Sequence, residues 1–212
     1  MRLRLHTQAR NSAGERVRIA LNLKGLDYEY VPIPDLAGPE YERLNPQQLM
    51  PTLEVDGQPI SQSLAILEYL EKVCPTPTIF PEDAVRRAQA RAFAVGICAE
   101  LHALTVKRVR KRLPSDLVSD WYAHWTSETL GALEKSVGRD QRFCFADCPT
   151  VADICLVPQM ANARRFGCDL SAFARLRAID ALCRALPAFA AALPERQVDF
   201  TAERPSDTQP RR

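Results

Sequence analysis

The start of the chain changes from a period of two in its apolar positions to a period close to four. Leu3 and Leu5 lie in a short alternating stretch that predicts a strand. The apolar stripe of a helix follows, formed by Val17, Ile19, Ala20, Leu21 and Leu23. The helix is expected to end at Lys24-Gly25, where a basic last turn meets a glycine. A second strand at residues 28–31 then completes a βαβ unit with a parallel strand pair.

The next segment predicts a hairpin and a helix. Asp56-Gly57 stands between short apolar stretches, the strongest local signal for a β-hairpin. An amphipathic helix follows from Ser63 to Val73. The first 80 residues therefore have the pattern of an α/β domain, βαβ followed by ββα.

The rest of the chain is helical in pattern. A proline-rich stretch at residues 74–84 is typical of a linker. Helical periodicity covers residues 84–113, 115–137 and 150–166, and shorter helices are expected as far as about residue 192. We therefore expect an α/β domain at residues 1–80 and an all-α domain at residues 81–200. Residues 201–212 have little apolar content and are expected to form a disordered tail.

Composition narrows the possible functions. The net charge of +2 on 212 residues gives no basic field of the kind that nucleic-acid binding needs. No apolar run reaches the roughly 18 residues of a membrane span, and MRLRLH is not followed by the apolar core of a secretory signal. The seven cysteines have no repeated paired spacing, so we expect free thiols in the cytoplasm and no metal site.

The turn between the first strand and the first helix is the first candidate for chemistry. The stretch QARNSAGERVRIAL places Asn, Ser and Gly at a helix N-terminus. Free backbone N–H groups and the helix dipole favour anions there. The pattern predicts an anion-binding turn.

Two further motifs each allow two interpretations. The Met50-Pro51 bond is either an ordinary trans bond opening a strand or a cis bond that exposes the Met50 backbone to a peptide-like ligand. Ser63 is either the N-cap of its helix or, with Gln62 and the first free N–H groups, part of a carboxylate site.

Basic residues in the helical half also allow two interpretations. Arg164 and Arg165 either complement a helix dipole, or one of them grips a carboxylate in a cleft. The basic run at residues 107–112 is either a solvated face or a surface that attracts dianions. Thr150 and Asp153 predict a structural capping box. His102 and His124 have no partner at a catalytic spacing.

Taken in order, several segments resemble the zeta class of glutathione transferases, and most closely its maleylacetoacetate and maleylpyruvate isomerases. These segments are RVRIALNLKG, NPQQLMPTL, the Asp56-Gly57 hairpin, QSLAILEYLE, the PTP linker, DCPTVADICLVPQ and NARRFGCDL, and they extend from about residue 10 to residue 170. The resemblance implies a thioredoxin-like domain followed by a helical domain, the glutathione transferase fold. It also implies glutathione as the cofactor and a homodimer.

The same resemblance implies a set of glutathione-binding residues. They are Gln48, Met50, Pro51, Gln62, Ser63 and Glu100. The Met50 backbone would bind the cysteinyl part of glutathione, and Gln62 with Ser63 would hold its γ-glutamyl carboxylate. Glu100 would reach the γ-glutamyl amine across the dimer interface.

The first turn departs from the pattern of the family. Asn11 stands where a serine is usual and Ala13 where a cysteine or threonine is usual, so only Ser12 keeps a hydroxyl. The segment at residues 31–46 is also a few residues shorter than usual. We expect Ser12, the helix N-terminus and Asn11 to stabilise a thiolate.

The isomerase mechanism implied by the resemblance needs no conventional general base. The thiolate adds to the cis double bond of a maleyl keto acid, the resulting enolate rotates about a single bond, and loss of the thiolate gives the trans, fumaryl product. Arg10 and Arg165, with Arg164 in reserve, are expected to hold the substrate's carboxylates.

Two other functions remain open from the sequence. The chain could conjugate or dehalogenate small electrophiles with glutathione, or it could bind glutathione without catalysis. Consumption of glutathione would indicate the first, and binding without turnover the second. The sequence does not distinguish maleylpyruvate from maleylacetoacetate.

Overall fold

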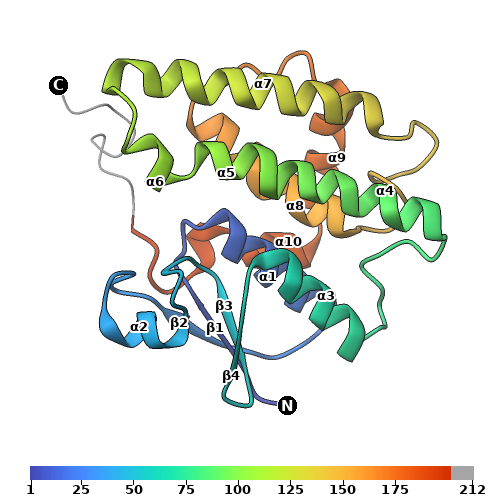
Figure 1. The fold of residues 1–212 in the computed structure, drawn as a ribbon. Helices are drawn as coiled ribbons and strands as arrows, with labels where there is room; N and C mark the ends of the chain where they lie inside the picture. The colour runs from blue at the N-terminus through green and yellow to red at the C-terminus, as the bar shows by residue number, and fades with distance from the viewer. Residues whose placement is uncertain (202–212) are drawn as a thin grey trace. The chain divides into compact units, whose positions relative to one another are not determined.

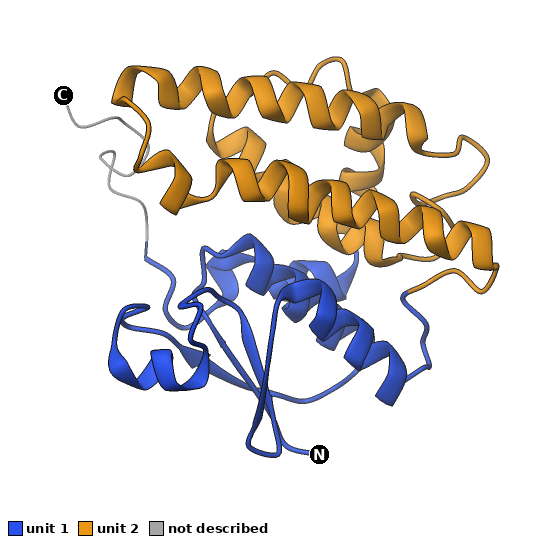
Figure 2. Cartoon of the chain, in the orientation of Figure 1, with its two compact units in different colours: residues 1–79, 185–201 blue, residues 80–184, 202–212 orange. Residues whose placement is uncertain are grey.

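A computed structural model of the chain describes residues 1–201. These residues form two compact units (Figure 2). Unit 1 consists of Met1–Ile79 together with Ala185–Thr201, and unit 2 begins at Phe80 and ends at Arg184. No helix within residues 1–201 is long and apolar enough to cross a membrane.

Unit 1 is built on a four-stranded mixed sheet (Figure 1). Its strands are β1 (Leu3–Thr7), β2 (Glu29–Pro32), β3 (Thr52–Val55) and β4 (Gln58–Ser61), in the order β2-β1-β3-β4. β1 pairs in parallel with β2 and antiparallel with β3, and β3 and β4 form the predicted hairpin. Leu5 lies opposite Leu53, and both are fully buried. The predicted βαβ-ββα order is confirmed.

Helices complete unit 1. They are α1 (Ser12–Leu23), α2 (Pro39–Leu44), α3 (Ser63–Val73) and α10 (Pro187–Ala192), followed by the short 3-10 helix η3 (Pro194–Arg196). α1 packs against both α3 and α10. The predicted end of α1 is confirmed, because Lys24 is its C-cap and Gly25 has a φ of +62°. α2 was not expected, because its six residues are too few to show a periodicity.

In the described part of unit 2, every regular element is a helix. They are α4 (Ala84–Val95), the π-helical turn η1 (Gly96–Leu101), α5 (His102–Thr105), α6 (Lys107–Arg110), η2 (Ser115–Leu117), α7 (Val118–Ser136), α8 (Val151–Arg165) and α9 (Ala174–Arg184). α8 lies at the core of the unit: residues 151–160 are all buried, and the helix contacts α4, α9 and η1. The predicted capping box at Thr150 and Asp153 is present.

The single helix predicted for residues 84–113 is wrong in detail. The chain passes from α4 into the π-helical η1, and the extended backbone of Val106 (φ −64°, ψ 150°) separates α5 from α6. The apolar stripe in the sequence does not reveal either irregularity, because most residues of the segment are still helical. The helices predicted at residues 115–137 and 150–166 are confirmed within a few residues.

The division into units also differs from the predicted domain boundary. Residues 185–200, assigned to the helical domain from their pattern, cluster with the sheet in unit 1. Hydrogen bonds to α1 account for the difference: Arg18 Nε donates to the Ala192 carbonyl at 2.9 Å, and Asn22 Nδ2 donates to the Ala188 carbonyl at 2.9 Å. Of the tail expected at 201–212, Thr201 belongs to unit 1, and residues 202–212 lie outside the described part of the chain.

Candidate functional site

The turn that precedes α1 has the geometry of a capped helix start. Asn11 is the N-cap, and its Oδ1 accepts a hydrogen bond of 2.5 Å from the Gly14 N–H. Ser12 is the first helical residue and is only 8% exposed. Since the amide oxygen of Asn11 acts as the cap, its NH₂ group is the end that can donate to a ligand.

Gly14 lets α1 approach the end of β1. A Cβ atom at this position would lie 2.0 Å from Thr7 Oγ1, so a larger residue requires the helix or the strand to move. Because Gly14 has no side chain, the N-terminus of α1 can lie close to the sheet. This close approach sets the position of Ser12.

Arg18 holds the backbone before the turn, a role that sequence reasoning missed. Its fully buried side chain donates to the Ala9 carbonyl at 3.1 Å and to the Gln8 carbonyl at 3.5 Å. Burial lowers the pKa of Arg18 from its ordinary value. The sequence shows an arginine inside an otherwise apolar helix stripe, which signals a buried cation but not its partners.

The segment around Pro51 has backbone groups without hydrogen-bond partners among the described residues, at Met50. The Met50–Pro51 peptide bond is cis. Tyr41 Oη and Asn45 Nδ2 both donate to the preceding carbonyl, that of Leu49, at 2.7 and 2.6 Å. Among the described residues, neither the N–H nor the C=O of Met50 has a hydrogen-bond partner. Such a backbone can pair with an extended peptide.

The start of α3 is an uncapped helix terminus. Gln62 occupies the N-cap position and Ser63 the first helical position, so Ser63 is not the cap that the sequence allowed. Within residues 1–201 no side chain caps this helix, and the N–H groups of its first turn suit an anion. Gln62 Nε2 donates to Gln47 Oε1 at 2.9 Å.

Arg16 joins the starts of α1 and α3. Its buried guanidinium donates from Nη1 to Ser63 Oγ at 3.3 Å. The contact brings a positive charge to the serine that sequence reasoning assigned to a carboxylate site. No pattern in the sequence indicates this role, because the two residues are 47 positions apart.

In unit 2, two arginines lie at one aromatic ring. The guanidinium groups of Arg110 and Arg165 lie over the ring of Phe166, at 4.6 and 5.0 Å from its centre, and Tyr122 stacks on the same ring at 4.0 Å. Burial lowers the pKa of Arg110, and the charge of Arg165 lowers it further. Two like charges at one ring favour a ligand with two negative charges.

Arg164 has a different environment from Arg165. Its Nη2 forms an ion pair with Oδ2 of Asp180, whose side chain is 1% exposed. Burial raises the pKa of Asp180, and Arg164 opposes that effect. Arg164 thus neutralises a buried carboxylate.

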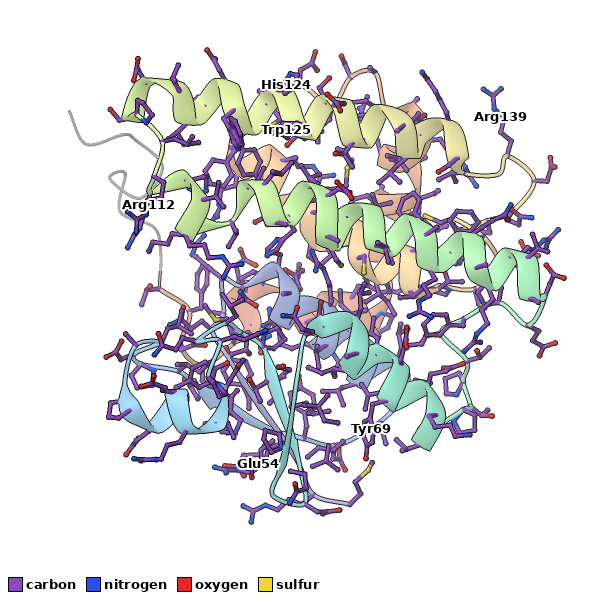
Figure 3. The ribbon with its side chains drawn as sticks, in the orientation of Figure 1. Glu54, Tyr69, Arg112, His124, Trp125 and Arg139 are labelled. Carbon is purple, nitrogen blue, oxygen red and sulfur yellow. The ribbon has the colours of Figure 1, made fainter. Side chains whose placement is uncertain are left out.

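Two further residues considered from the sequence, Glu100 and His124, belong to unit 2. Glu100 is exposed and belongs to η1. His124 is exposed on α7 (Figure 3), and its Nε2 lies 3.4 Å from Glu128 Oε2. The free-thiol expectation fits a structure in which all seven cysteines are unbridged.

Comparisons with known proteins point to one family. The profile of the glutathione S-transferase N-terminal domain matches residues 12–73. The maleylacetoacetate isomerase of Pseudomonas aeruginosa is 40% identical over 94% of this chain and 100% of its own. The maleylpyruvate isomerase of a Ralstonia species is 39% identical over 93% of this chain and 99% of its own.

Solved structures agree with these relatives. A maleylpyruvate isomerase described as a bacterial zeta-class glutathione S-transferase superposes with a TM-score of 0.90, at 36% identity over 93% of this chain and 100% of its own. The maleylacetoacetate isomerase of Anaeromyxobacter dehalogenans, with glutathione bound in its active site, gives a TM-score of 0.85 at 39% identity, over 94% of this chain and 98% of its own.

Proposed function

The chain belongs to the zeta class of glutathione transferases, and we propose that it is a glutathione-dependent isomerase. Its substrate is a maleyl keto acid, maleylpyruvate or maleylacetoacetate, and its product is the fumaryl isomer. One observation carries the proposal: the hydrogen bond from Arg16 to Ser63 brings together the starts of α1 and α3. Those two helix starts suit two of the three anionic groups of glutathione, its thiolate and its γ-glutamyl carboxylate.

The described residues fit glutathione as a ligand. The unpaired N–H and C=O of Met50, beside Pro51, suit the cysteinyl backbone. Gln62, Ser63 and the uncapped N-terminus of α3 suit the γ-glutamyl carboxylate. Gln48 is proposed to bind the same ligand, and Glu100 is proposed to bind its amine from the partner subunit. When bound, glutathione supplies a thiolate that adds to the double bond and departs again after rotation.

The residues of the first turn favour that thiolate. Free thiols ionise at a pH of about 8 to 9, so the anion needs stabilisation at neutral pH. Ser12 donates from its hydroxyl, Asn11 donates from its NH₂ group, and the N-terminus of α1 adds the positive end of the helix dipole. These donors replace the richer set of hydroxyl and thiol groups that is usual at this turn.

Arginines hold the substrate in this proposal. Arg10 and Arg165 each bind a carboxylate, since a guanidinium matches its geometry. Arg110 shares the Phe166 ring with Arg165 and adds positive charge. The same charges stabilise the oxyanion that develops on the keto group during the reaction. Arg164 stays the reserve choice, because it already pairs with Asp180.

A direct assay tests the function. Both maleyl compounds are followed by absorbance with and without glutathione, and total thiol is measured before and after. We expect isomerisation that requires glutathione and leaves the thiol content unchanged. Thiol loss in proportion to turnover of a halide or epoxide, with no isomerisation, would instead indicate a conjugating transferase. Calorimetric binding of glutathione without turnover of any electrophile would indicate a binding protein.

A homodimer in the cytoplasm is also part of the proposal, by analogy with the class. Light scattering on the purified protein measures the mass directly, and we expect twice the 23.8 kDa of one chain. If Glu100 acts in the partner's site, Glu100→Ala weakens glutathione binding without changing that mass.

A further inference from the structure

The end of the described chain contacts the turn that carries Arg10. Asp199 accepts two hydrogen bonds: Oδ2 from the Ala9 N–H at 3.0 Å, and Oδ1 from Tyr30 Oη at 2.7 Å. Ala9 directly precedes Arg10, and Tyr30 lies on β2, so one carboxylate joins the sheet to the turn. We call residues 197–201 the C-terminal strap.

The next two residues of the strap contact Arg10 itself. The guanidinium of Arg10 lies 4.7 Å from the centre of the Phe200 ring. Its Nε and Nη2 donate to the Thr201 carbonyl at 3.4 and 3.3 Å. Three consecutive residues of the strap thus contact the pair Ala9-Arg10, which lies about 190 positions earlier in the chain.

The strap is itself anchored within unit 1. Gln197 Nε2 donates to the carbonyls of Ala191 and Leu193, at 3.1 and 2.9 Å. Arg18 donates to the carbonyls of both Ala9 and Ala192. Because Arg18 holds the C=O of Ala9 and Asp199 holds its N–H, side chains from two segments fix this residue from both ends. The strap therefore restrains the turn instead of merely lying on it.

We propose that Asp199 is a positioning residue that sets the direction of Arg10 and, through it, the affinity for the dicarboxylate substrate. The proposal rests on the function proposed above, in which Arg10 binds a substrate carboxylate. An arginine side chain has many rotamers, and a ligand that must order them binds more weakly than one that meets an ordered group. The strap provides this order before the substrate arrives, by fixing the backbone at Ala9 and by supporting the guanidinium on Phe200.

Three variants separate positioning from general stability. Asp199→Ala removes both hydrogen bonds. Asp199→Asn can keep both, because the amide oxygen accepts from the Ala9 N–H and the NH₂ group donates to Tyr30 Oη. Gln197→Ala is the matched control, since it loosens the strap at contacts that do not touch the turn.

The measurement is binding of malonate, an unreactive dicarboxylate, to the glutathione-loaded protein by calorimetry, together with steady-state kinetics. We expect Asp199→Ala to weaken malonate binding and to raise the substrate KM by about tenfold, the usual effect of losing a charge-assisted hydrogen bond. Glutathione affinity should change less than about twofold. Asp199→Asn should recover most of the loss, and Gln197→Ala should lose much less malonate affinity than Asp199→Ala does.

Different outcomes overturn different claims. Unchanged malonate binding in Asp199→Ala, or equal losses for malonate and glutathione, would overturn the positioning role. If Gln197→Ala weakens malonate binding as much as Asp199→Ala does, the strap acts only as a structural support. If the unaltered protein binds malonate but isomerises neither maleyl compound, the proposed function fails while the positioning role is still decided by the binding data. If Asp199→Ala does not fold, Asp199→Asn and Tyr30→Phe, which removes one of the two contacts, decide the question by the same titration.

Discussion

Gln48 and Gln62 adopt backbone conformations that side chains disfavour, and both belong to the proposed glutathione site. Their φ angles are 52° and 69°. A residue other than glycine held in such a conformation costs about 1 to 3 kcal/mol, and strain of this kind is often kept where it serves a ligand. At Gln62 the conformation directs the side chain toward Gln47 at the uncapped start of α3.

Replacement of Gln62 by glycine separates stability from binding. Glycine adopts positive φ without steric cost, so we expect Gln62→Gly to raise the free energy of unfolding by about 1 kcal/mol. The same change removes the amide that is proposed to bind the γ-glutamyl carboxylate, so the KM for glutathione should rise severalfold. Urea denaturation and initial-rate kinetics measure the two effects. A variant that is both more stable and unchanged in KM would exclude Gln62 from the site.

Asn11 and Ser12 should also give different results when each is replaced by alanine. Asn11→Ala removes the cap of α1 and should lower the free energy of unfolding by about 1 kcal/mol. Ser12→Ala keeps the cap but removes the only hydroxyl of the turn, so it should lower glutathione-dependent turnover more than Asn11→Ala does. Thermal denaturation and the rate at saturating substrate measure these effects. Equal activity of Ser12→Ala and the unaltered protein would remove Ser12 from the thiolate role.

At this scale, sequence reasoning proposed residues whose surroundings are set close to their own segment. Ser12, Met50 and Gln62 stand at the start of a helix or beside a proline, where local rules apply. The roles of Arg18 and Asp199 were not predicted, because their partners lie far away in the chain. Asp199, for example, accepts a hydrogen bond from Ala9 at a separation of 190 residues. Periodicity carries no information about such contacts.

At the scale of elements, a buried ion pair ties the end of α1 to α3 and to the segment after it. Lys24 Nζ donates to Glu71 Oε2 at 2.8 Å and to the carbonyls of Cys74 and Pro77 at 2.6 and 2.9 Å. Burial raises the pKa of Glu71, but hydrogen bonds from Lys24, Thr78 and the Ile79 N–H outweigh it, so the net pKa is lowered.

This lowered pKa predicts how stability depends on pH. The stabilisation from Glu71 is fully present above the ordinary pKa of 4.5 and is lost as the pH falls through the lowered value. Glu71→Gln should therefore reduce the free energy of unfolding by about 3 kcal/mol at pH 7, where it leaves Lys24 without its carboxylate. The difference from the unaltered protein should shrink below about pH 4. Urea denaturation at pH 7 and pH 3.5 tests this, and a constant difference would contradict it.

Elements with a long and regular pattern were predictable, and irregular ones were not. The stripe of α1 and the Asp56-Gly57 turn determine their elements locally. The break at Val106 depends on packing within unit 2, as does the π-helical turn at residues 96–101. A short helix such as α10 has the same pattern in either unit, so its place with the sheet follows from its contact with α1.

At the scale of the whole molecule, each unit contributes different chemistry. Unit 1 has the helix starts and the Met50 backbone proposed for glutathione, and unit 2 has the arginines around Phe166. Arg165 of unit 2 is proposed to contact the substrate and not glutathione, so its replacement should affect one Michaelis constant and not the other. The adjacent residues Arg164 and Arg165 allow this to be tested with a matched pair.

Arg165→Met should raise the KM for the maleyl substrate by about tenfold or more, because a lost guanidinium–carboxylate contact is charge-assisted. The KM for glutathione and the melting temperature should change little. Arg164→Met should have the opposite effects. It leaves the buried carboxylate of Asp180 without its ion-pair partner, so it should lower the free energy of unfolding by about 2 kcal/mol. The KM for the substrate should not change. Kinetics with each ligand varied in turn, together with thermal melts of both variants, measure these effects. If Arg164→Met raises the substrate KM and Arg165→Met does not, the carboxylate clamp belongs to Arg164. If Arg165→Met shifts both constants together, Arg165 does not act on the substrate alone.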